Sequence, residues 1–168
     1  MIAYLGGILL IAGVAVIQTN LLHGIAIMSV RPDLLLILIT FIANKNGPGV
    51  GQGAGAFSGI LQDLLSLAPL GFYTLVNTVI GFLYGFSKGN VFLDGLIFPM
   101  MLVALATLLK GLLFTVVAFV FGIEGVVSTV FSTAFLVEIL YNALLAPVLY
   151  GIMGRMRWLM LDYRERNY

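Results

Sequence analysis

Four long apolar runs constrain the fold of this chain more than any other feature. Residues 2–22 and 71–86 hold no charged residue, while residues 96–121 and 129–153 hold one each. An α-helix needs about 20 predominantly apolar residues to cross the roughly 30 Å hydrocarbon core of a bilayer. Three of the runs reach that length, and the fourth reaches it with its flanking residues. We therefore expect an integral membrane protein in which each run is a transmembrane helix.

The composition narrows the functional classes. Of the 168 residues, 61% are hydrophobic and 9% are charged, whereas a soluble domain carries about 25% charged residues. These proportions exclude an ordinary soluble enzyme and a disordered protein. The net charge of +1 creates no field that would attract nucleic acid. Because the chain has no cysteine and one histidine, we expect no catalytic site, no metal site and no cofactor.

The segment between the first two runs predicts a hairpin of two short helices. Pro32 and Asp33 are typical of the first turn of a helix, where the carboxylate meets the positive end of the helix dipole. An apolar stretch follows, then a turn at residues 44–48 and a glycine-rich segment at 49–66. We expect both helices to be short or tilted and buried by their neighbours. The fold predicted is an all-α bundle of six transmembrane helices, or five with a re-entrant segment.

Charges outside the spans predict the orientation of the bundle. Lysine and arginine concentrate in cytoplasmic loops. With the N-terminus inside, only Arg31 lies outside, and six cations lie inside: Lys45, Lys88, Arg155, Arg157, Arg164 and Arg166. Residues 1–154 then form the membrane bundle, and residues 155–168 form a basic and aromatic cytoplasmic tail. We expect Arg155, Arg157 and Trp158 to anchor this tail at the membrane surface.

Glycines spaced four residues apart form a smooth stripe on one predicted helix. The stripe comprises Gly47, Gly51, Gly55 and Gly59, and Asp63 is the next position on it. Small residues let helix backbones approach closely in membranes, so we expect another helix to press against the stripe. The following helix carries a matching row, namely Asn77, Gly81 and Gly85. The stripe predicts either a packing groove or a surface that a partner or ligand approaches.

Further polar residues lie inside predicted spans. Gln62 precedes Asp63, and Asn142 lies one helical turn after Glu138, so we expect Gln62 and Asn142 to be buried polar packing residues. Asp63 has two candidate partners, Arg31 in the outer loop and Lys110 in a later span. Its role is either structural pairing or shaping of the partner groove.

Lys110 and Glu138 predict an intramembrane ion pair. Each lies fourteen residues from Glu124, near the centre of the turn that joins their helices, so the two lie at the same depth in an antiparallel hairpin. An unpaired charge at mid-bilayer costs at least about 2.5 kcal/mol. We therefore expect a structural salt bridge, and a proton or ion relay is the alternative.

Three stretches of the sequence form a recognisable pattern: the run that begins Arg31-Pro32-Asp33, the turn at Gly47-Pro48 and, most specifically, the element Asp63…Pro69-Leu70-Gly71. Together they resemble the rod shape-determining MreD family. The resemblance implies a fold similar to the substrate-binding subunits of energy-coupling-factor vitamin transporters. Lys110 and Glu138 are not part of the family pattern.

The resemblance also implies a function and partners. It implies a non-catalytic scaffold in the bacterial inner membrane that binds the single-span protein MreC during side-wall peptidoglycan synthesis. A RodA-like glycosyltransferase, a penicillin-binding transpeptidase and MreB filaments belong to the wider complex. The alternative is a substrate-binding subunit of an energy-coupling-factor vitamin transporter, and an ion-coupled carrier is a third class.

Overall fold

The computed structural model describes residues 2–20, 30–89, 95–122, 132–156 and 159. These residues form six α-helices: α1 (Ile2–Asn20), α2 (Leu34–Asn46), α3 (Pro48–Leu65), α4 (Phe72–Gly85), α5 (Ile97–Phe121) and α7 (Thr133–Arg155). The all-α prediction is confirmed, and each apolar run of the sequence holds one helix. The short hairpin that the sequence predicts is the pair α2 and α3.

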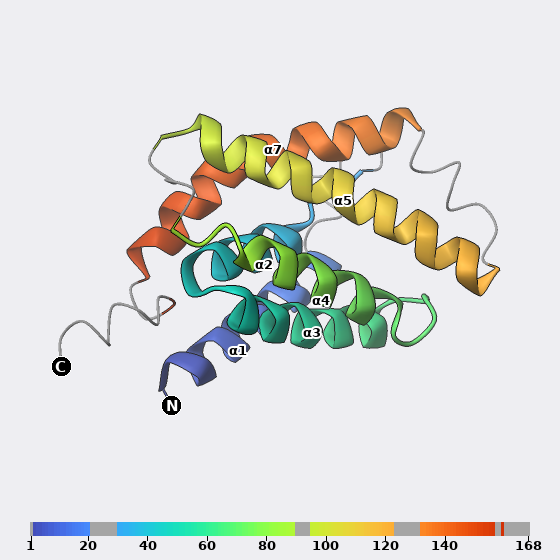
Figure 1. Cartoon of the computed structure of the whole chain (residues 1–168), viewed down its shortest axis with the longest axis horizontal. Coiled ribbons are helices and arrows are strands. Elements are labelled where there is room, and N and C mark those ends of the chain that lie inside the picture. The colour runs from blue at the N-terminus through green and yellow to red at the C-terminus, as the bar shows by residue number, and fades with distance from the viewer. Residues whose placement is uncertain (1, 21–29, 90–94, 123–131, 157–158, 160–168) are drawn as a thin grey trace.

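Two of these helices are long and apolar enough to cross a membrane by themselves. They are α5, with 25 residues, and α7, with 23 residues. They contact each other and lie side by side at the top of Figure 1. Helices α2 and α4 have only 13 and 14 residues, so the number of crossings beyond these two remains a prediction.

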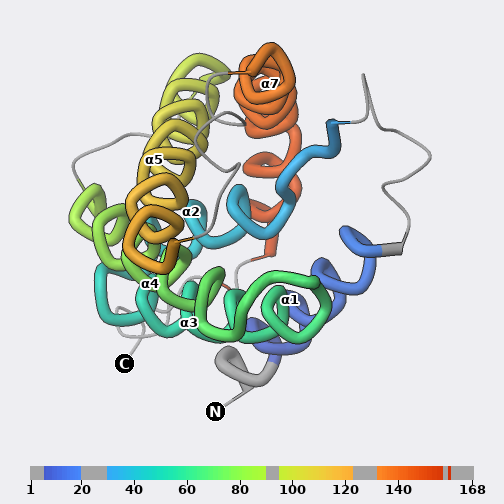
Figure 2. Tube along the Cα trace, turned by 90° about the vertical axis from the view of Figure 1, so that its right-hand side faces the viewer, coloured from blue at the N-terminus to red at the C-terminus, as the bar shows by residue number. Residues whose placement is uncertain are grey.

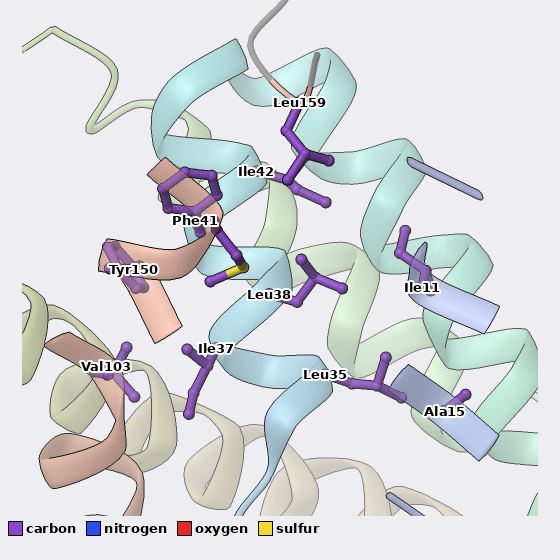
Figure 3. Close-up of a cluster of buried hydrophobic side chains, with 12 residues drawn as sticks. Ile11, Ala15, Leu35, Ile37, Leu38, Phe41, Ile42, Val103, Tyr150 and Leu159 are labelled. Atoms are coloured by element: carbon purple, nitrogen blue, oxygen red, sulfur yellow. The ribbon is translucent and has the colours of Figure 1, made fainter. Parts of the chain in front are cut away.

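Helix α2 lies at the centre of the fold. It contacts α1, α3, α4, α5 and α7, and the residues from Leu35 to Asn44 are all buried. Such burial suits a helix that is apolar on every side. Figure 3 shows side chains of α2 among residues from α1, α5 and α7, with Ile11, Val103 and Tyr150 lying around them. The expected burial of this helix by its neighbours is confirmed.

Polar contacts fix both ends of α2. At its N-terminus, the Asp33 carboxylate accepts a hydrogen bond from the Leu36 amide at 3.0 Å, as an N-cap residue does. At its C-terminus, Asn44 donates to the Ser87 hydroxyl at 2.8 Å, just beyond α4. Asn46 donates to the Leu159 carbonyl at 2.9 Å, just beyond α7. The C-terminal ends of α2, α4 and α7 therefore lie at one end of the bundle.

Helices α3 and α4 form an antiparallel hairpin against α2. Both contact α2, and they lie next to each other in both views of the molecule (Figures 1 and 2). The two helices have the most extensive contact of any pair in the fold. This contact contains the glycine stripe.

Candidate functional site

The glycine stripe of α3 packs against the backbone of α4. Gly51, Gly55 and Gly59 are buried, and a Cβ atom on any of them would overlap main-chain atoms of α4. At Gly55 the overlap would be with the Asn77 carbonyl, and at Gly51 with the Gly81 carbonyl. The prediction that another helix presses on this stripe is confirmed. The prediction of a partner groove is wrong, because the chain's own α4 fills it.

Asp63 ties the end of α3 to the start of α4. Its carboxylate is buried and accepts hydrogen bonds from the amides of Gly71 (2.9 Å), Tyr73 (2.8 Å) and Thr74 (3.2 Å). The Thr74 hydroxyl donates a fourth bond at 2.6 Å. A helix N-terminus offers unpaired amides and a positive dipole end, so Asp63 acts as a cap supplied by the neighbouring helix.

The contacts of Asp63 replace the partners predicted for it. It was expected to meet Arg31 or Lys110, but in the structure its oxygens face the amides of α4. The turn that makes this possible includes Gly71, whose φ of 93° lies in the left-handed region. The Asp63…Gly71 spacing in the sequence therefore reflects a cap, in which a residue near the end of α3 accepts hydrogen bonds from the start of α4.

The predicted buried polar residues Gln62 and Asn142 are both in hydrogen bonds. Asn77 donates its side-chain amide to the Gln62 carbonyl at 2.7 Å, beside the glycine stripe. Asn142 of α7 is fully buried. It accepts from the Asp33 amide at 2.8 Å and donates to the Thr107 hydroxyl at 3.2 Å. Asn142 therefore joins α7 to α2 and α5.

A buried polar centre forms around Asp33, between four helices. The Asp33 carboxylate pairs with Lys110 of α5 and accepts from the Gln18 side chain of α1 at 3.1 Å. The Gln18 carbonyl in turn accepts from the Leu35 amide at 3.0 Å. Both Asp33 and Lys110 are more than nine-tenths buried. Charges inside a membrane bundle are expected to be paired in this way.

The ion pair of Lys110 corrects the pairing predicted from sequence. Glu138 was expected as its partner, but the salt bridge that the structure shows is with Asp33. Lys110 and Glu138 still line one cavity, as their equal depth requires. The prediction compared only α5 and α7. It did not include α2, whose N-cap residue Asp33 places a second carboxylate at the level of Lys110. The Lys110 ammonium also lies 5.1 Å from the ring centroid of Phe114, within cation–π distance.

The cavity lies at the end of the bundle opposite the C-terminal ends of α2, α4 and α7. Its volume is about 560 Å³. Residues from the last turn of α1, the segment before α2, the last turn of α3, the middle of α5 and the first turns of α7 line it. Four of its lining residues are charged: Arg31, Asp33, Lys110 and Glu138. The sequence did not indicate this cavity, because the loops near it have few polar residues.

Asp33 is the residue of this polar centre whose contacts the sequence predicted least completely. The sequence assigned it to a helix start, which the structure confirms, but not to an ion pair. One feature of the sequence could have indicated the ion pair. Asp33 directly precedes a helix that is apolar on every side, so its carboxylate had to be buried with that helix and needed a cation. Of the predicted tail anchor, Arg155 lies exposed in the last turn of α7, while Arg157 and Trp158 lie outside the described residues. Within the described ranges, no three potential metal ligands come together.

The family relationship of the chain extends over all six described helices. The model of the rod shape-determining protein MreD matches residues 1–156. The chain belongs to the MreD family. Membership of the MreD family implies a rod shape-determining role, and the apolar helices mark this member as a membrane protein. The match covers the Asp63 cap, the glycine stripe and the polar centre at Asp33.

No curated protein and no solved structure matches the chain. The expected similarity to the substrate-binding subunits of energy-coupling-factor transporters therefore has no support from these comparisons.

Proposed function

We propose that this protein is a non-catalytic scaffold subunit of the bacterial cell-elongation complex. It binds an MreC-like single-span protein and, through it, a RodA-like glycosyltransferase, a penicillin-binding transpeptidase and MreB filaments. The observation that carries this proposal is the MreD-family match over residues 1–156. A scaffold needs no reactive group, and its work is to hold partners side by side while the side wall is made.

The partner surface of this scaffold is on the outer faces of the long helices. The glycine stripe is occupied by α4, so a partner helix has to pack elsewhere. Helix α7 carries an exposed row with a spacing of four residues: Leu136, Leu140, Leu144 and Val148. Residues with this spacing lie on one face of a helix, and this face is open to either lipid or a partner helix.

Native mass spectrometry of the tagged protein from its own host tests the proposal. We expect a stoichiometric complex with a single-span protein, accompanied by a transpeptidase or polymerase. A photocrosslinking residue at Leu140 should then form an adduct with that protein, while one at the fully buried Ile37 should form none. Isolation with an ATPase module and no single-span protein would contradict the scaffold function and favour a transporter subunit.

We also propose that both termini lie in the cytoplasm, with residues 1–154 as the membrane bundle and the tail at its inner surface. Three cations support this orientation, because they lie at the end of the bundle where the C-termini of α2, α4 and α7 meet. Lys45 lies in the last turn of α2, Lys88 follows α4, and Arg155 ends α7. Arg31 lies before α2, at the other end. The positive-inside rule places the end with three cations in the cytoplasm.

The absence of native cysteine makes this orientation easy to measure. Single cysteines replacing Lys88 and Arg31 can be labelled in intact cells with a membrane-impermeant maleimide. We expect labelling at position 31 alone, and labelling at position 88 alone would reverse the orientation.

A substrate-binding subunit of a vitamin transporter remains the second candidate function. The single observation that favours it is the cavity of about 560 Å³, since ligand sites have volumes of about 300–1,000 Å³. Co-purification of an ATPase module, in the experiment above, would favour this candidate.

A further inference from the structure

The charges that line the cavity divide into a paired set and an unpaired set. Asp33 and Lys110 neutralise each other in a buried ion pair. Arg31 and Glu138 also line the cavity, but neither has a hydrogen bond or an ion pair among the described residues. The cavity therefore presents one guanidinium and one carboxylate without a direct partner, and the carboxylate feels the charge of Lys110 only at a distance.

The two unpaired groups differ in setting. Arg31 is exposed, lies in the segment before α2 and lines the cavity. Glu138 is half-buried in the second turn of α7. No polar side-chain atom of the described residues is both buried and unpartnered, so the unpartnered Glu138 oxygens are not fully buried, and Glu138 lines the cavity. A carboxylate in an apolar bundle is costly without a cationic partner.

We propose that this cavity binds a zwitterionic group that carries a primary ammonium and an oxyanion. The ammonium binds Glu138 through charge-assisted hydrogen bonds, and the oxyanion binds Arg31, whose guanidinium suits carboxylate and phosphate. Phe135 and Tyr73 also line the cavity and offer aromatic rings to the ammonium. This site is separate from the partner surface proposed on α7, and its test does not depend on that surface.

Two further polar residues of the wall, Gln18 and Asp33, are occupied by contacts within the protein. Both ends of the Gln18 amide are used, one by Asp33 and the other by the Leu35 amide. Asp33 is likewise occupied by Gln18, Leu36 and Lys110. Arg31 and Glu138 are therefore the charged lining residues left to bind the charged groups of a ligand. The cavity lies at the ends of helices, which suits a headgroup rather than an acyl chain.

The same chemistry has two sources, the phosphoethanolamine headgroup of a membrane lipid and free phosphoethanolamine. Native mass spectrometry of the purified chain in detergent separates them when each probe is titrated alone. The lipid probes are dioleoyl phosphatidylethanolamine, phosphatidylcholine, which has no N–H, and phosphatidylglycerol, which has no ammonium. The soluble probe is free phosphoethanolamine, followed by isothermal titration calorimetry. Binding of free phosphoethanolamine, or binding of phosphatidylethanolamine in preference to the other two lipids, supports the proposal and identifies the source.

Substitutions of Glu138 and Arg31 test which residue binds the ammonium of the ligand and which binds its phosphate. We expect Glu138→Gln to weaken phosphatidylethanolamine binding about tenfold, the effect of one lost charge-assisted hydrogen bond, and to leave phosphatidylglycerol binding unchanged. Arg31→Gln should weaken both lipids, because both contain phosphate. Arg155→Gln, an exposed arginine at the other end of the bundle, is the matched control and should change neither.

Two results would overturn the proposal. One is equal binding of the three lipids to the wild-type chain together with no binding of free phosphoethanolamine. The other is a phosphatidylethanolamine preference that persists in folded Glu138→Gln. If Glu138→Gln does not fold, the wild-type lipid series and the exposed Arg31→Gln variant still decide the question.

Discussion

Lys110 of α5 forms a buried ion pair with Asp33 at the N-terminus of α2, 77 residues earlier in the chain. The same aspartate caps α2 and accepts from Gln18 of α1. Its backbone amide donates to Asn142 of α7. Four helices therefore meet at one residue, and the stability of the bundle should depend on that residue and its partners.

Lys110→Met should destabilise the protein by about 3–5 kcal/mol, because it leaves the Asp33 carboxylate buried without its cation. Asp33→Asn combined with Lys110→Met should lose less, since asparagine is uncharged and can still cap α2. Thermal melting in detergent, followed by circular dichroism, measures both. Lys45→Met at the other end of α2 is the control and should change stability by less than about 0.5 kcal/mol. A double variant less stable than Lys110→Met would contradict the pairing.

Gly55→Ala should separate α3 from α4 and unfold the hairpin or destabilise it by more than about 2 kcal/mol, because the added methyl group overlaps the Asn77 backbone. Gly53, two residues earlier, has open space where its Cβ would be. Gly53→Ala should therefore stabilise the helix by about 0.5–1 kcal/mol. The same melting experiment compares the pair, and equal stability of the two variants would refute the packing described for the stripe.

Asp63→Ala should destabilise the chain by about 2–4 kcal/mol, since three amides and one hydroxyl at the start of α4 lose their acceptor. Thr74→Val removes only the hydroxyl and should cost about 1 kcal/mol. Hydrogen exchange of the Tyr73 and Thr74 amides checks the cause directly. Unchanged protection of these amides in Asp63→Ala would show that the cap is not what holds α4.

Asn142→Leu should cost about 1–3 kcal/mol, because the substitution leaves the buried Asp33 amide without an acceptor. Leu144→Ala, on the exposed side of the same helix, is the comparison and should have a smaller effect. Chemical denaturation in mixed micelles measures the difference. A larger loss for Leu144→Ala would place the outer face of α7, rather than the polar centre, in the stabilising role.

The helices could be predicted from the sequence because apolar run length and turn residues are local signals. The run at 96–121 contains α5, whereas the turn expected at residues 44–48 is confined to Gly47, because α2 continues to Asn46 and Pro48 begins α3. The contact of α3 with α4 was also predictable, since Gly51 and Gly55 have matching small or polar partners in Gly81 and Asn77. In these cases the information lies within one helix or one hairpin.

The polar centre could not be predicted in full, because its residues are distant in the sequence. The equal depth predicted for Lys110 and Glu138 agrees with the finding that both line one cavity, but the prediction compared only the two helices of one hairpin. The position of Asp33 depends on how α2 inserts between α5 and α7, which is a tertiary property. Asp63 was misassigned for a related reason, since the partners of its carboxylate are backbone amides, which every residue except proline has.

The central position of α2 has a consequence for how the protein is made. A ribosome delivers α2 before α5 and α7, yet Asp33 finds its lysine 77 residues later and its asparagine 109 residues later. Until then the carboxylate has neither partner, and the apolar helix has no neighbours on that side. Completion of the bundle therefore waits for nearly the whole chain, so truncation before α7 should yield a protein that the cell degrades rather than a smaller working bundle.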